Sequence, residues 1–222
     1  TATNTPVPTI DIATATATPT FTATYTPLPT PTNTATPAQL TLNFSANADA
    51  RVQSNNPTTN YGASAQLRAR NSAPVYNSYL RFVVSGVTGP VLSAKLRLYV
   101  VDASPNGGSV YVAANNYIST TTPWTETGII WNNAPAITGS PLSTMGAVIT
   151  DTWAEFDVTA AVQADGTFNF ALTSPSNNDV YYNSKEAATN KPVLVLQVGS
   201  APVVTATATN TPIPPTSTPI PP

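Results

Sequence analysis

Short segments in which apolar and polar residues alternate run through the middle of the chain, separated by clusters of Gly, Pro, Asn and Ser. Successive side chains of a β-strand point to opposite faces, so alternation with period two is typical of half-buried strands. The longest segment places five apolar residues on one face: Leu92, Ala94, Leu96, Leu98 and Val100. The pattern predicts an all-β chain that folds as an antiparallel, jelly-roll-like β-sandwich.

The alternation defines the strands that we expect. They cover residues 40–44, 48–53, 65–70, 78–84, 91–101, 109–113, 146–150, 153–158, 167–173, 180–183 and 192–198. Only residues 159–164 indicate helix, as a single turn between two strands. The hydrophobic core is therefore expected between two sheets.

The composition changes abruptly at both ends of this middle region. Residues 1–37 contain 15 threonines, 7 prolines and one charged residue, and residues 205–222 contain 6 threonines, 6 prolines and no charge. Residues 38–204 hold every base, every tryptophan and all but one of the acids. We expect one domain over residues 38–204, long enough to bury a core, between two Thr/Pro-rich, mucin-like stalks.

The absence of two residue types excludes several functions. With no cysteine and no histidine, the chain cannot form a thiol or imidazole nucleophile, a Ser-His-Asp triad, the usual zinc sites or a disulfide framework. A net charge of −2 argues against nucleic-acid binding, and no apolar run is long enough to span a membrane. Because no charged-then-apolar leader precedes Thr1, we expect a processed form or a piece of a longer protein.

The N-terminal stalk has a regularity of its own, because every threonine between residues 14 and 36 stands at an even position. In an extended strand these hydroxyls would share one face and the odd residues the other, whereas a three-residue polyproline repeat would mix them. Two interpretations remain open: an O-glycosylated spacer without fixed structure, or a strand added to a neighbouring domain. Prolines would restrict such pairing to short pieces or to a sheet edge.

Two sets of residues follow from this pattern. The expected O-glycosylation sites are Thr14, Thr16, Thr18, Thr20, Thr22, Thr24, Thr26, Thr30, Thr32, Thr34, Thr36, Thr205, Thr207, Thr209 and Thr211. The expected assembly residues are Ala13, Ala15, Ala17, Phe21, Ala23 and Tyr25. Residues 1–9 (TATNTPVPT) and 207–215 (TATNTPIPP) are also related, which indicates a tandem array, a tail that meets a neighbour's head, or chance similarity of low-complexity sequence.

The middle region resembles the DNRLRE-type domain, which is akin to the family-96 carbohydrate-binding modules. The resemblance rests on Ala48-Asp49-Ala50-Arg51-Val52, Asn60-Tyr61-Gly62, Leu67-Arg68, Ser78-Tyr79-Leu80-Arg81-Phe82, Ala94-Lys95-Leu96-Arg97-Leu98-Tyr99, Trp124-Thr125-Glu126, Ile130-Trp131-Asn132-Asn133-Ala134-Pro135, Trp153-Ala154-Glu155-Phe156-Asp157-Val158-Thr159 and Ser184-Lys185-Glu186-Ala187. It implies a jelly-roll-like sandwich in an extracellular protein, polysaccharide binding or a structural role, and no catalysis.

Candidate binding residues are few. Sugar recognition would use exposed aromatic rings, for which the sequence offers Trp124, Trp131, Tyr61, Tyr181 and Tyr182. The alternative for Trp124 and Trp131 is a structural one, closing one end of the sandwich.

Oxygen-rich loops raise the question of calcium. Asn177 and Asp179 are the candidate ligands, without the spaced carboxylates of an EF-hand. Asn-rich turns also occur because Asn tolerates turn conformations, so we expect no cofactor.

Catalysis is the least favoured function. Glu155 and Asp157 share one strand face, as a glycosidase pair would, but we predict structural roles: ion pairs with strand arginines such as Arg81 and Arg97, and a turn cap shared with Thr159.

The sequence thus favours a structural subunit of an extracellular, glycosylated fibril or cell-surface stalk, which self-associates head-to-tail through its Thr/Pro segments. The alternative is a carbohydrate-binding module on O-glycosylated linkers of a larger secreted protein. Expected partners are other copies, attached glycans and, for the alternative, a polysaccharide.

Overall fold

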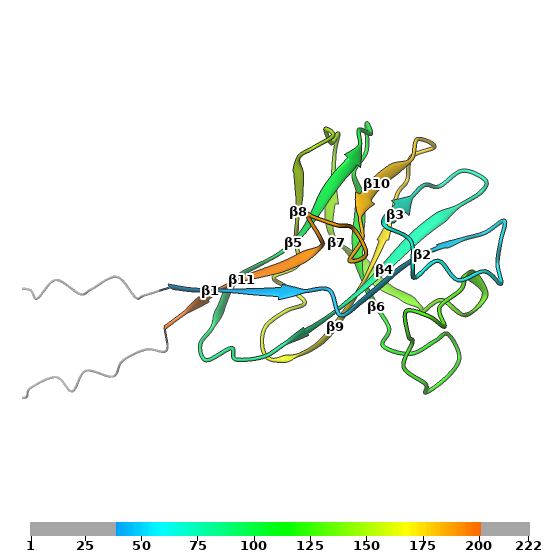
Figure 1. Cartoon of the computed structure of the whole chain (residues 1–222). Helices are drawn as coiled ribbons and strands as arrows, with labels where there is room; N and C mark the ends of the chain where they lie inside the picture. Colours follow the sequence, from blue (N-terminus) through cyan, green and yellow to red (C-terminus); the bar gives the residue numbers. More distant parts are fainter. Residues whose placement is uncertain (1–38, 201–222) are drawn as a thin grey trace, which may run out of the picture. The chain divides into compact units, whose positions relative to one another are not determined.

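The computed structural model describes residues 39–200 (Figure 1). Its strands are β1 (Gln39–Ser45), β2 (Ala48–Gln53), β3 (Gln66–Ala69), β4 (Tyr76–Val84), β5 (Val91–Asp102), β6 (Gly108–Ala113), β7 (Ile137–Met145), β8 (Trp153–Asp157), β9 (Gly166–Thr173), β10 (Val180–Asn183) and β11 (Val193–Gly199). A 3-10 turn, η1 (Trp131–Asn133), precedes β7. The predicted stalks and their glycosylation and assembly residues lie outside the described residues.

The strands form two antiparallel sheets, which confirms the predicted all-β sandwich. One sheet has the order β1-β11-β5-β10-β3, with β8 also paired to β5, and the other has the order β2-β4-β9-β6-β7. The main core contains buried apolar side chains from both sheets, such as Leu96 and Leu194 from one and Phe82 and Leu172 from the other. Burial between two sheets is the reason why alternating strands, rather than helices, form here.

The alternation of β5 holds over most of the strand and fails at its beginning. Ala94 and Leu96 are fully buried, as predicted, but Leu92 is 50% exposed, and Val91 is buried in its place. In the ladder with β11, Gln197 pairs with Ser93 while Val198 pairs with Val91. This bulge inserts one extra residue into β5 and shifts the phase of the alternation, so the prediction for Leu92 was wrong.

The strand predicted over residues 146–150 is also wrong, because the strand lies just before it, in β7. The segment ITGSPLSTM contains Gly139 and Pro141, which are typical of turns. β7 is an edge strand whose register with β6 shifts between Val110 and Val112, and such a strand tolerates proline. The predicted single turn after β8 is present, since the N–H groups of Ala161 and Val162 both donate to the carbonyl of Val158.

A second, smaller core lies on the outer face of the β2-β4-β9-β6-β7 sheet. The long connection between β6 and β7, residues 114–136, places Trp124 and Ile129 over small or flat residues of this face, including Ala50, Tyr79 and Ala171. The Tyr79 hydroxyl donates to the carbonyl of Pro135 over 3.2 Å. The connection therefore covers part of the sheet and leaves the rest of the face open.

The two ends of the described chain lie side by side, because Gln39 pairs with Gly199 at the ends of β1 and β11 (Figure 1). β1 has β11 on one edge and, among residues 39–200, no strand on the other. None of these residues belongs to a helix that is long and apolar enough to cross a membrane.

Candidate functional site

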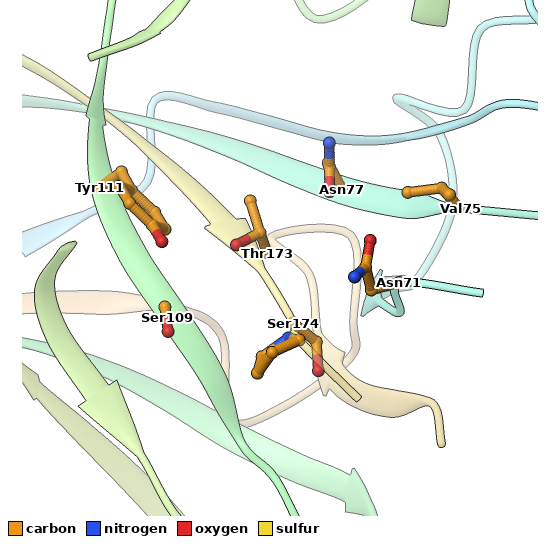
Figure 2. Close-up of a pocket in the computed structure, with 8 residues that line it drawn as sticks. Asn71, Val75, Asn77, Ser109, Tyr111, Thr173 and Ser174 are labelled. Atoms are coloured by element: carbon orange, nitrogen blue, oxygen red, sulfur yellow. The ribbon is translucent and has the colours of Figure 1, made fainter. Parts of the chain in front are cut away.

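The open part of the outer sheet face forms a hollow of about 370 Å³. Figure 2 shows Asn77 from β4 and Tyr111 and Ser109 from β6 on opposite sides of Thr173, which belongs to β9. The remaining lining comes from loops and consists of Asn71, Val75, Ser174 and Pro175. The hollow thus spans three neighbouring strands.

The register of the strands explains why these side chains converge. Thr173 pairs with Ser109, and Ala171 pairs with Tyr111 on one side and with Tyr79 on the other. Residues two apart on a strand share a face, so Asn77 lies beside Thr173 on the face where Tyr79 is already covered. The hollow begins where the cover of residues 114–136 ends.

The lining suits a ligand with many hydroxyl groups. Amide side chains both donate and accept hydrogen bonds, and a tyrosine ring adds an apolar face beside them. Within residues 39–200, the side-chain polar atoms of Asn71, Asn77, Tyr111 and Thr173 take part in no hydrogen bond. These four side chains are therefore free to bind a ligand, and none of the lining residues is charged.

An arginine–tyrosine cluster lies on the strands beside the hollow. The Arg68 guanidinium lies 3.6 Å from the centre of the Tyr76 ring and 4.9 Å from that of Tyr181. Arg70 lies 4.9 Å from the Tyr76 ring, and Arg51 lies 4.8 Å from the ring of Tyr61. Asp179 is the carboxylate of this cluster, so the cluster has an excess of positive charge.

The sequence of the domain that carries the hollow matches a known family. The sequence model described as carbohydrate-binding module family 96 matches residues 40–198, which is most of the chain and the whole sandwich. The chain belongs to carbohydrate-binding module family 96. No curated protein matches the chain. The family that the sequence motifs resemble is therefore confirmed, and the name describes binding modules rather than enzymes.

The prediction that Trp124 and Tyr182 bind sugar is wrong for this family-96 module. Trp124 and Tyr182 are both fully buried, because the first fills the core under residues 114–136 and the second faces the main core. Neither ring can offer a face to a sugar. The structural alternative for Trp124 holds, and its Nε1 donates to Asn169 Oδ1 over 2.8 Å.

The other aromatic candidates of the module are only partly accessible. Trp131 packs against the Trp124 core as a half-buried side chain. Tyr181 and Tyr61 are half-buried, and each lies under a guanidinium of the arginine–tyrosine cluster. None of these three rings lines the hollow.

The two candidate calcium ligands, Asn177 and Asp179, do not form a calcium site in this module. Both carboxylate oxygens of Asp179 accept from Arg68, over 2.8 and 2.7 Å, and Arg70 lies 3.3 Å from Oδ2. A carboxylate held by two cations is unsuited to bind a third, and Asn177 alone makes no site. Among residues 39–200, no group of three acidic side chains could hold a metal ion.

The two strand carboxylates of β8 serve as ion-pair partners. Glu155 lies 2.9 Å from Arg97, and Asp157 lies 2.6 Å from Lys95. Asp157 also accepts from the N–H and the hydroxyl of Thr159, and the hydrogen bonds from Lys95 and Thr159 lower the pKa of Asp157 to about 2. Arg97 pairs as predicted.

Arg81 does not pair with an acid, contrary to the prediction. Its side chain donates to Asn169 Oδ1 over 3.0 Å and to the Trp124 carbonyl over 2.7 Å. It thereby holds the cover of the sheet face.

One acidic group of the module is fully buried. Asp49 on β2 accepts from the backbone N–H of Lys185 over 2.7 Å. Its Oδ1 meets no N–H or O–H donor within residues 39–200. Burial, to which the nearby charges of Glu186 and Glu126 add, raises the pKa of Asp49 to about 8.

Lys185 links this pair to the cover of the outer sheet face. Its ammonium lies 2.6 Å from Glu186 and 3.0 Å from Glu126, which belongs to residues 114–136. Burial acts to raise the pKa of Glu186, but the hydrogen bond and charge of Lys185 outweigh it and lower that pKa. Lys185 and Glu186 thus form an ion pair within the Ser-Lys-Glu motif, beside the buried carboxyl of Asp49.

The sequence did not identify the hollow. Its residues Ser109, Tyr111 and Thr173 stand at polar positions of predicted strands, and Asn77 directly precedes another predicted strand. This was the only signal available. Their convergence depends on strand order and register.

Proposed function

We propose that the domain binds a polysaccharide chain in the hollow between β4, β9 and β6, as a non-catalytic module of an extracellular protein. The observation that carries the proposal is the set of four unengaged polar side chains around the hollow, in a member of a carbohydrate-binding family. Asn71 and Asn77 supply amides, Thr173 a hydroxyl, and Tyr111 a ring on which a sugar can stack.

The position of the hollow on the domain agrees with this function. Asn77 and Val84 lie near opposite ends of β4, seven positions or about 23 Å apart along the strand. The chain ends lie near Val84, because the loop after Val84 leads to Val91, and Val91 pairs with Val198. The chain enters and leaves the sandwich at the opposite end, so linkers would leave the hollow accessible (Figure 1).

Acidic polysaccharides are the ligands to test first. Arg70 directly precedes Asn71, and Tyr76 directly follows Val75, so a sugar chain that extends beyond these lining residues would reach the arginine–tyrosine cluster. Arg68 and Arg70 share the single carboxylate of Asp179, and Arg51, over the Tyr61 ring, adds a third positive charge. The remaining charge would attract carboxylate groups of a ligand.

The test is isothermal titration of the full chain with an acidic and a neutral polysaccharide. We expect micromolar binding that Tyr111→Ala and Asn77→Ala each weaken by at least about tenfold, because each removes a central contact.

The matched control is Tyr99→Ala, which removes a half-buried tyrosine from the outer face of the other sheet and should leave affinity unchanged. Binding that survives the loss of both Tyr111 and Asn77 would place the site elsewhere, and no binding to any polysaccharide would refute the proposal.

A second function, assembly into a glycosylated fibril or surface stalk, is favoured by one observation. The uncovered edge of β1 begins where the Thr/Pro segment ends. In this function the even threonines of residues 14–36 carry O-linked glycans, and head-to-tail contacts propagate because they do not close on themselves.

Deletion of residues 1–37 tests this second function. We expect the shortened chain to remain folded and monomeric, because the deleted residues precede β1, whereas the full chain forms polymers visible by electron microscopy. Polymers of unchanged length from the shortened chain would contradict assembly through this segment.

A further inference from the structure

One edge of β1 pairs with no strand among residues 39–200, and it lacks the features that usually prevent a sheet edge from pairing with another chain. Its seven residues pair with β11 in one unbroken register, from Gln39–Gly199 to Ser45–Val193. They contain no charge, no proline and no bulge. Soluble proteins use those features to prevent pairing with other chains, so an edge without them is expected to have a partner.

The other edges of the described sandwich are protected. β3 has four residues and carries Arg68, β8 carries Glu155 and Asp157, and β7 contains Pro141 and a register shift. β2 carries charged residues and is almost wholly buried. The contrast within one domain makes the bare edge of β1 a specific feature rather than a general property of its sheets.

The core-facing side chains of β1 are incompletely covered. Leu40 is 49% exposed, and Leu42 and Phe44 are only half-buried. In the next strand, Leu194 and Leu196 are fully buried. A further strand beside β1 with apolar residues on its inner face would therefore bury the Leu40, Leu42 and Phe44 side chains and stabilise the pairing.

We infer that the free edge of β1 accepts residues 13–26 of a second copy of this chain as an added strand. The odd residues of that segment, among them Ala17, Phe21 and Ala23, cover the apolar face of β1, and the even threonines face outward. The inference rests on the second proposed function, assembly, and is independent of polysaccharide binding.

The positions of the prolines agree with this pairing. The backbone N–H and C=O of one strand residue point to the same edge, and those of the next residue point to the other. If the even threonines direct their backbone groups to β1, the odd residues direct theirs away from it. Pro19, which lacks an N–H, stands at an odd position, where no donor is needed.

The chain's own segment is a poor occupant of the same edge. Pro27, Pro29 and Pro31 lie between residue 26 and the start of β1. Alternating prolines favour an extended spacer over a tight turn. A segment on such a spacer reaches the β1 edge of a neighbour more readily than that of its own domain.

The parity of a new proline provides the test, in the full chain. Thr22→Pro removes an N–H that would bond to β1, whereas Ala23→Pro removes one that would face solvent. We expect Thr22→Pro to reduce the polymer fraction in sedimentation velocity at least about tenfold, and Ala23→Pro, which keeps an apolar side chain toward β1, to reduce it far less. Thr22→Ala, which keeps the N–H and loses the hydroxyl, controls for the glycan.

A variant on the acceptor side completes the test. Leu40→Lys introduces a charge on the exposed, core-facing end of β1 and should also prevent assembly, with an unchanged melting temperature because Leu40 is half exposed. Equal assembly of the two proline variants, or full assembly of Leu40→Lys, would overturn the inference. If residues 1–37 are needed for polymers but proline parity has no effect, assembly stands and the β1 pairing fails.

Discussion

Replacing Trp124 by alanine is expected to lower the free energy of unfolding by about 3–5 kcal/mol. The indole is fully buried between residues 114–136 and the outer sheet face. Its Nε1 donates to Asn169, and the Arg81 guanidinium lies 4.4 Å from the ring centre. Its loss leaves a large cavity and removes one of the two hydrogen bonds that Asn169 Oδ1 accepts, and both effects destabilise the fold.

Urea unfolding followed by circular dichroism measures this effect. The matched control is Trp153→Ala, since Trp153 is half-buried on the outer face of the other sheet, against Tyr99 and Arg97. We expect its cost to be less than half that of Trp124→Ala. Similar costs would mean that residues 114–136 hold the sheet face without help from the Trp124 indole.

The second large effect is on the pH dependence of stability, and it comes from Asp49. Its pKa is about 8 in the folded chain, against 3.8 for an ordinary aspartate. Between these values the folded chain keeps a proton that the unfolded chain has lost, so the free energy of unfolding falls as pH rises. The expected slope is about 1.4 kcal/mol per pH unit, and it should disappear above about pH 8.

Asp49→Asn isolates this contribution. The amide reproduces the uncharged carboxyl and keeps an oxygen that accepts from the N–H of Lys185. Urea unfolding between pH 5 and pH 8 should show a sloping profile for the unmodified chain and a nearly flat one for the variant. Below that range Glu186, whose pKa is lowered, acts with the opposite sign.

The comparison has two informative outcomes. A variant that is more stable than the unmodified chain at pH 8 supports the raised pKa of Asp49. Parallel profiles for the two proteins would show that Asp49 is ionised in the folded chain. The charge of Lys185, rather than a bound proton, would then offset the repulsion between Asp49 and the carboxylates of Glu186 and Glu126.

Much of the fold could be predicted from the sequence. The β5 alternation from Ala94 to Val100 is the signal of a strand with one face in a core, and its burial follows directly. The 3.3 Å advance per residue and the period of two are local properties of an extended chain. Family motifs are also local, which is why the family assignment agrees with the match over residues 40–198.

The errors arose where strand neighbours matter. Leu92 is exposed because β5 has a bulge at this point in its pairing with β11. The residues of β7 are typical of turns, and they form a strand because they pair with the edge of β6. Neither partner is adjacent in the sequence, so no local pattern could have shown the bulge or the strand.

By itself, the sequence determined the sandwich class and the family, because these depend on periodicities and motifs that each segment carries alone. Only the tertiary structure decided which aromatic residues are accessible. Trp124 and Tyr182 became core residues, and Tyr111, Asn77 and Thr173 became the lining of a hollow, because strand order and register bring distant residues onto one face. That pairing is a property of the whole chain, since each strand's neighbours are selected by burial across both sheets.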